Sequence, residues 1–138
     1  MTNQNNPLDY VKAIQAQLVS IVSPIPVYQE FNRNWATEPQ FITWSLRNVH
    51  QPVYTGSTQN VKGIDRPVFQ MSIFTKTSSD AWDICNTVLQ SLHGYTGQFG
   101  GLTGIWVAKA DVDVLYKTYD NEIGLQQIIL DCTLDIPA

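Results

Sequence analysis

The sequence has few of the residues on which enzyme and metal sites depend. Its 138 residues include only two histidines, His50 and His93, and two cysteines, Cys85 and Cys132. None of the four has zinc-ligand spacing, and the chain has no G-x-S-x-G, H-E-x-x-H or C-x-x-C motif. A Cys85–His50 pair would have to form across the fold, and a buried, unreactive thiol is the simpler interpretation. We expect no catalytic residue, no metal and no cofactor.

Charge and long apolar runs are also scarce. Charged residues make up 14% of the chain, with 8 basic against 12 acidic residues, so the net charge is −4. That balance disfavours binding of nucleic acid through overall charge. No apolar run approaches the ~18 residues of a membrane-spanning helix, and the first residues carry no basic or apolar signal region. We expect a soluble protein made inside the cell, with both cysteines as buried free thiols.

The length of the chain fits one domain, 1–138, whose core is large enough to fold without a disulfide or a metal. The polar residues 1–6 are expected to form a disordered tail. Charge is uneven along the domain, because residues 111–138 contain six acidic residues and only one lysine. The C-terminal quarter should therefore present an acidic surface.

Two segments have the spacing of amphipathic helices. The first begins at Asn6 and Pro7 and ends before Pro24, as capping and proline rules suggest. Its predicted buried face consists of Leu8, Val11, Ile14, Leu18 and Ile21. The second helix follows the capping residues 77–80 and runs to residue 93, where Gly94 ends it.

Alternating apolar and polar residues predict strands over 40–49, 68–75, 105–118 and 124–136, with a short strand at residues 27–28. Residues 50–67 lack periodicity and form a long loop. Residues 119–122 turn the chain, so the last two strands form a hairpin. The simplest register places Asp111 near Asp131 on its solvent face. The fold class is therefore α+β: a mostly antiparallel β-sheet packed against two α-helices, with a long loop and a C-terminal β-hairpin.

Residues 94–104 contain five of the eight glycines. A phosphate-binding loop is disfavoured there, because the glycines follow a helix C-terminus and the helix dipole has the wrong sign for an anion. Phe99 lies in the middle of this segment. It either anchors a partner or packs back onto the core, and the sequence leaves both alternatives open.

The order of these elements resembles the tail-completion, or tail-terminator, proteins of long-tailed bacteriophages. The resemblance rests on the opening helix, on Pro24-Ile-Pro-Val-Tyr28, and on the strands Gln40-Phe-Ile-Thr-Trp44 and Arg66-Pro-Val-Phe-Gln-Met-Ser-Ile-Phe74. The following helix and the closing segment from Gly124 to Leu134 also match. The resemblance covers nearly the whole chain.

The resemblance implies a structural virion protein and no enzymatic activity. Such proteins form rings, usually of six subunits, that cap the head-proximal end of the tail tube, end its polymerisation and join the tail to the head connector. The implied partners are further copies of the chain, the tail tube protein and the head–tail connector or stopper, with DNA passing through the lumen without specific binding. Another neck component, either a head-completion adaptor or a stopper, and a small cellular ligand-binding module are the alternatives.

A cyclic ring has head-to-tail contacts, so each subunit needs two different complementary patches. The exposed sheet edge, the long loop and the glycine-rich segment are candidates, because edges and protruding loops readily add to a neighbour. The residues expected at subunit or partner contacts are Tyr54, Lys62, Arg66 and Phe99.

The channel of such a ring must let DNA pass without binding it. An acidic lining repels phosphates and avoids the affinity that counterion release gives to a basic one. We expect Asp111, Asp113 and Asp131 to face the channel.

Overall fold

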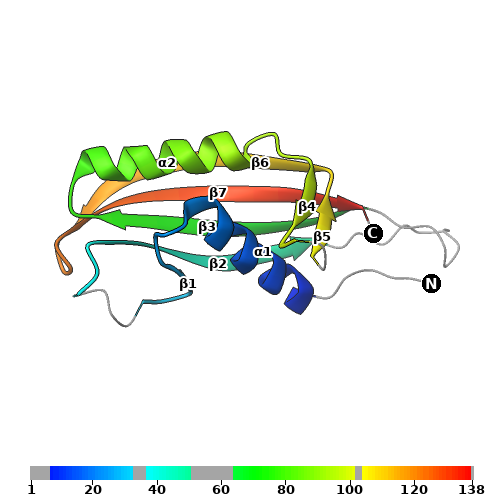
Figure 1. The fold of residues 1–138 in the computed structure, drawn as a ribbon, viewed down its shortest axis with the longest axis horizontal. Coiled ribbons are helices and arrows are strands. Elements are labelled where there is room, and N and C mark those ends of the chain that lie inside the picture. Colours follow the sequence, from blue (N-terminus) through cyan, green and yellow to red (C-terminus); the bar gives the residue numbers. More distant parts are fainter. Residues whose placement is uncertain (1–6, 33–36, 51–63, 102–103, 138) are drawn as a thin grey trace, which may run out of the picture.

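A computed structural model describes residues 7–32, 37–50, 64–101 and 104–137 of the chain (Figure 1). The expected tail at residues 1–6 lies outside this part, and so do Tyr54 and Lys62. The elements follow one another as α1 (Pro7–Val22), β1 (Val27–Gln29), β2 (Gln40–His50), β3 (Ile64–Thr75), α2 (Ser78–Leu92), β4 (Gly97–Phe99), β5 (Ile105–Val107), β6 (Lys109–Asp120) and β7 (Leu125–Pro137).

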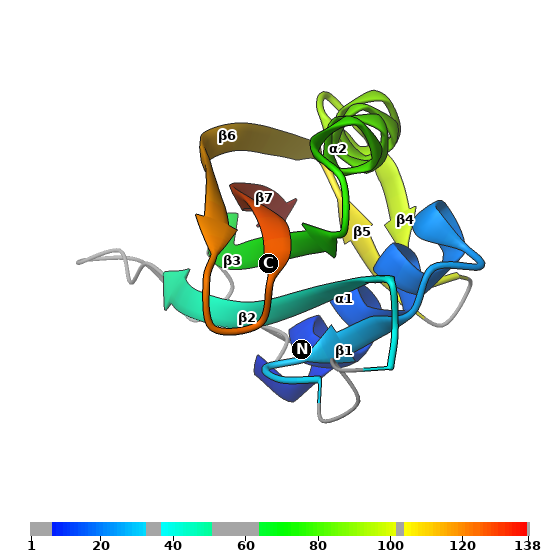
Figure 2. The ribbon, with the colours of Figure 1, turned by 90° about the vertical axis from the view of Figure 1, so that its left-hand side faces the viewer.

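Five of these strands form one sheet in the order β1-β2-β3-β7-β6, while β4 and β5 form a separate two-stranded sheet. Strand β1 pairs with β2 in parallel, and the other neighbours are antiparallel. Figure 2 shows both helices on the same side of the curved five-stranded sheet. The predicted α+β class is confirmed, including the C-terminal hairpin of β6 and β7.

The core lies between the sheet and the helices, and β3 and β7 supply its centre. Phe69, Met71 and Ile73 alternate along β3 and are fully buried, as predicted. On β7, alternate positions are likewise buried. Since successive side chains of a strand point to opposite faces, the residues between them must face the other side of the sheet. The buried residues of β7 at even positions are Ile128, Leu130, Cys132, Leu134 and Ile136.

Helix α2 matches its prediction more closely than helix α1. Thr77 caps α2, and its hydroxyl accepts a hydrogen bond from the Asp80 N–H at 3.2 Å. In α1 the predicted buried face is rotated, since Leu8 is 57% exposed. The residues of α1 that are buried are Tyr10, Ala13, Ile14, Leu18 and Val22.

Two contacts explain the orientation of α1. The Tyr10 hydroxyl donates a hydrogen bond to the fully buried Asp65 carboxylate of β3. On the next turn, Ala13 lies against Gly100, where an added Cβ would come within 2.9 Å of the Ala13 Cα. The Gly100 N–H also donates to Gln17 Oε1 at 3.0 Å. A buried polar pair and a close backbone approach therefore override the simple apolar stripe.

The predicted strand over 105–118 is divided in the structure. Ile105 and Val107 are buried in β5, which pairs with β4, whereas Ala110 and Val112 are buried in β6. The buried positions change from odd to even numbers, so Trp106 is half exposed. The prediction of one continuous strand over 105–118 was wrong, because residues 105–107 leave the main sheet and pair with β4.

Two further expectations about loops are corrected. Strand β3 begins at Ile64, so residues 64–67 belong to the sheet and not to the loop predicted over 50–67. Phe99 is fully buried in β4, with its ring 5.6 Å from that of Tyr95. Of the two alternatives for Phe99, packing on the core is the one observed.

The buried Tyr10–Asp65 contact provides a test of this core. Tyr10→Phe removes the donor and should lower the free energy of unfolding by about 1–3 kcal/mol, because a buried carboxylate oxygen loses a hydrogen bond. Urea denaturation measures this change. Tyr95→Phe is the matched control, since its hydroxyl donates to the Gln98 carbonyl at an exposed site. Equal losses in the two variants would show that burial of the Asp65 contact adds nothing.

Candidate interaction surface

The side of the five-stranded sheet away from the helices is polar towards the end where β2 and β7 finish. At its other end it holds a small buried apolar group, in which Phe41 stacks on Phe74 at 4.9 Å and Ile129 lies nearby. In the described part of the chain no helix covers this side (Figure 2). We call this side the open face. Its polar and charged members come from β2, β3, β6 and β7, and they include Ser45, Arg47, Arg66, Gln70, Lys109, Asp111, Asp113, Asp131, Thr133 and Asp135.

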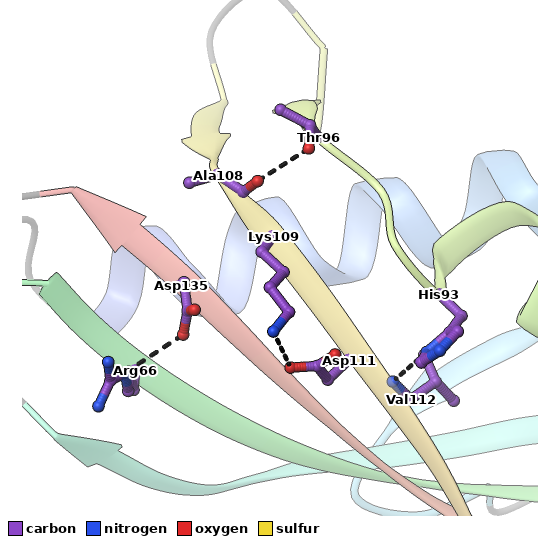
Figure 3. A network of polar contacts seen from close by, with 8 residues as sticks. All are labelled: Arg66, His93, Thr96, Ala108, Lys109, Asp111, Val112 and Asp135. Carbon is purple, nitrogen blue, oxygen red and sulfur yellow. Dashed lines mark hydrogen bonds and ion pairs between the residues drawn. The ribbon is translucent and has the colours of Figure 1, made fainter.

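Three ion pairs cross the open face. Arg47 Nη1 lies 2.5 Å from Asp131 Oδ2, and the Asp131 side chain is only 19% exposed. The other two pairs, Arg66–Asp135 at 3.3 Å and Lys109–Asp111 at 3.2 Å, are more open to solvent (Figure 3). Exposed pairs of this kind each stabilise a protein by about 0–1 kcal/mol. Their larger effect here is to pair three of the six acidic residues of the predicted acidic surface, Asp111, Asp131 and Asp135.

The register of the hairpin differs from the simplest one. Asp113, and not Asp111, lies directly opposite Asp131, while Asp111 lies opposite Thr133. Like charges opposite each other destabilise a sheet, and the Arg47 guanidinium from β2 offsets this repulsion by reaching Asp131. Among the described residues, no basic side chain forms an ion pair with Asp113, which is exposed.

The structure places the remaining predicted contact residue, Arg66, within β3 on the open face. Phe99 lies in the core and is not part of this surface. The sequence pattern put Arg47 on the polar side of its strand but gave no sign of its partner. That partner, Asp131, is 84 positions away along the chain, so only strand order and register bring the two together.

Cys85, Cys132 and His93 lie in environments that suit a structural role and not a reactive one. Cys85 and Cys132 are buried and free. Burial raises the pKa of both thiols, and the nearby carboxylates of Asp111, Asp113 and Asp131 raise that of Cys132 further. The predicted free, buried thiols are confirmed. His93 Nδ1 accepts a hydrogen bond from the Val112 N–H at 3.1 Å (Figure 3).

Within residues 7–32, 37–50, 64–101 and 104–137, no three His, Cys, Asp or Glu side chains are grouped so that they could hold a metal ion. Neither described helix is long and apolar enough to cross a membrane.

These features define a small α+β protein with one sheet face packed on helices and the other open and ion-paired.

No family model and no curated protein matches the sequence. Solved structures match the fold. A PVC sheath/tube terminator of an extracellular contractile injection system, in its extended state, has a TM-score of 0.58 and 14% identity, over 99% of this chain and 57% of that one.

Two other solved chains are similar in length to this protein. One, without a stated function, has a TM-score of 0.56 and 15% identity, over 91% of this chain and 94% of that one. A chain from the virion of a native gene transfer agent particle has a TM-score of 0.49 and 16% identity, over 94% and 92%. The chain thus spans little more than half of the sheath/tube terminator, and it shares that terminator's fold. The resemblance seen in the sequence is confirmed at the level of the fold.

The like-charge pair on the open face predicts coupling between Arg47 and Asp113. Arg47→Met should lower the free energy of unfolding by about 1 kcal/mol, since it leaves Asp113 and Asp131 without a neutralising group. Asp113→Asn should recover roughly half of that loss in the Arg47→Met background and little in the parent chain. Urea denaturation of the four proteins measures the coupling. Additive effects would mean that Arg47 does not act on this pair.

The buried thiols predict slow chemical labelling. At pH 8 a thiol reagent should modify the folded protein at least ~100-fold more slowly than the same protein in 6 M urea, because only an accessible thiolate reacts. The measurement is the rate of absorbance change with a disulfide reagent. Fast labelling of Cys85 in protein that keeps its circular dichroism would contradict the structural role and reopen the question of a reactive cysteine.

Proposed function

We propose that this protein is a tail terminator, a structural virion protein that caps the head-proximal end of a tail tube. In this role several copies, most simply six, form a ring that ends tube polymerisation and joins the tail to the head connector. The observation that supports the proposal is the similarity of fold to a sheath/tube terminator over 99% of this chain. The resemblance of the sequence to tail-completion proteins supports the same role.

The open face suits the lining of a channel for DNA. It combines three basic with four acidic side chains, most of them held in ion pairs. Charges paired in this way leave few free cations for phosphates, so little counterion release would favour DNA binding. In this proposal Asp113 supplies the unpaired negative charge on the lining, with Asp111 and Asp131 beside it.

The proposed role is not enzymatic, and it requires no cofactor. The buried thiols with raised pKa values are consistent with that. An adaptor or stopper of the neck would also form a ring, so it is distinguished only by what it binds. A ligand-binding module needs an apolar cavity. The space between α1 and β5 is too small for a water molecule, but hollows of about 190 and 270 Å³ lie beside Ile84 and beside Phe74, so such a module is distinguished by ligand binding and not by cavity size.

Ring formation and tube capping test the proposal together. Light scattering over a wide concentration range, with negative-stain images of the same fractions, should show a closed ring with a central hole, either alone or after purified tail tubes are added. Tubes polymerised in the presence of the protein should stop at a fixed end with the ring attached. A protein that stays monomeric and leaves tube growth unchanged would overturn the proposal.

The channel assignment has its own test, Asp113→Lys. The new lysine lies opposite Asp131, which Arg47 already pairs, so the fold should be kept. The added positive charge leaves the lining with more cations than carboxylates, which should retard DNA passage and lower infectivity at least ~10-fold. The control is Asp83→Lys, an equal charge change on the exposed side of α2. Unchanged infectivity of the Asp113→Lys phage, with capping intact, would remove Asp113 from the channel without affecting the terminator role.

A further inference from the structure

The two edges of the five-stranded sheet differ in how their backbone groups are satisfied. At the β1 edge, Pro26 and Glu30 bond to β2, so the carbonyls of Val27 and Gln29 point away from the sheet. Both are occupied within the chain. The Val27 carbonyl accepts from Gln15 Nε2 at 3.1 Å, and the Gln29 carbonyl accepts from the Phe31 N–H at 2.8 Å. The outward carbonyls of β1 are therefore unavailable to a further strand. Beyond β1, residues 45–50 of β2 have no second neighbouring strand among the described residues.

The β6 edge is closed over its first part only. The Thr96 hydroxyl donates to the Ala108 carbonyl at 2.8 Å, just before β6 begins. The Gly94 N–H donates to the Ala110 carbonyl at 2.8 Å, and the Val112 N–H donates to His93 at 3.1 Å. Figure 3 shows the first and last of these contacts. The connector after α2 therefore occupies the edge as far as Val112.

Beyond Val112 the edge of β6 has no such cover. In the described part of the chain, its backbone bonds only to β7 and to the turn that joins the two strands. Figure 2 shows β6 bending away from α2 over this part. A register shift between Val114 and Tyr116 leaves Leu115 without a partner in β7. We call residues 114–119 the open edge. Uncovered edges of this kind readily accept another strand.

The side chains of the open edge favour an apolar contact surrounded by negative charge. Val114, Leu115, Tyr116 and Tyr119 are 37%, 45%, 55% and 49% exposed, which is a high density of large apolar groups for six residues of surface strand. The acidic residues Asp113, Asp120 and Glu122 flank them, whereas the one basic residue, Lys117, is engaged with Gln126 Oε1 at 2.6 Å. Charge complementarity selects a partner with apolar and basic residues.

A second copy of this chain does not offer such a partner within its described residues. The outward carbonyls of its β1 are occupied, and residues 45–50 of its β2 contain one arginine, Arg47, and no lysine. Three basic side chains on its strands, those of Arg47, Arg66 and Lys109, already form ion pairs within the same copy. Two copies of the open edge placed side by side would bring the flanking carboxylates together. The described residues of a second copy therefore fit the open edge poorly, and a strand from a different protein fits it better.

We propose that the open edge binds an extended segment of a different protein, in which apolar and basic residues alternate, and that this segment pairs with β6 as a sixth strand of the sheet. Backbone hydrogen bonds provide the pairing, and the exposed apolar groups and flanking carboxylates provide the selectivity. The proposal names a partner surface, and it holds whether or not the protein forms a ring.

The test uses the full chain and a fluorescein-labelled peptide, TKVRVKIT, with TEVEVEIT as the charge-reversed control. Fluorescence anisotropy should show binding of the basic peptide at least tenfold tighter than binding of the acidic one. Hydrogen exchange should show slowed exchange of the backbone amides of residues 114–119 in the complex. Leu115→Lys should weaken binding at least tenfold, whereas Leu8→Lys, at a leucine of α1 that is 57% exposed, should leave it unchanged.

Three results would overturn the proposal. The first is equal affinity for the two peptides or no binding of either. The second is protection by the peptide of amides outside β6. The third is protection of residues 114–119 in the protein alone as its concentration and native mass rise, which would make a second copy the occupant. Native mass and tube capping by the Leu115→Lys protein are measured separately, so failure of the edge proposal is distinct from failure of the terminator role.

Discussion

The pairing of β3 with β7 is the interaction on which the rest of the structure depends. These strands lie at the centre of the sheet and come from distant parts of the chain, with Phe69 opposite Cys132 and Met71 opposite Leu130. Each strand buries alternate side chains under the helices. Because the alternation has a period of two, a slip of one residue would move every buried side chain to the open face. The register is therefore strongly fixed, and it sets the positions of β2 and β6 on either side.

The same register determines the electrostatics of the open face. Once β3 and β7 are paired, Arg66 lies beside Asp135, and Arg47 can reach Asp131 across β3. Asp113 is then placed opposite Asp131. A segment with a large excess of acidic residues in the sequence thus becomes part of a surface with few unpaired charges. Such a surface is compatible with DNA moving past it, because neither strong attraction nor strong repulsion is built into it.

Backbone hydrogen bonding explains why the two ends of β6 differ. The glycine-rich connector after α2 allows Gly94, with φ +79°, to turn the chain back against the edge of β6. Beyond that point the strand bends away from α2 and exposes its apolar side chains (Figure 2). Edge strands are usually protected against association. The edge of β6 is covered as far as Val112 and uncovered beyond it. This difference is why the proposed strand-binding surface is confined to the open edge.

Local sequence patterns determined much of this protein. Alternation in β3 and β7 gave their buried faces, and Thr77 and Gly94 marked the ends of α2. The turn predicted at residues 119–122 gave the hairpin, although β6 continues to Asp120 before the chain turns. The tertiary structure decided the rest. Helix α1 is rotated by the Tyr10–Asp65 contact and by the closeness of Gly100 to Ala13. Residues 105–107 leave the main sheet because β4 offers them a partner. The ion pairs of the open face depend on strands that are neighbours only after folding. Short-range periodicity reports which side of an element is buried, but it carries no information about which distant residue will lie against it.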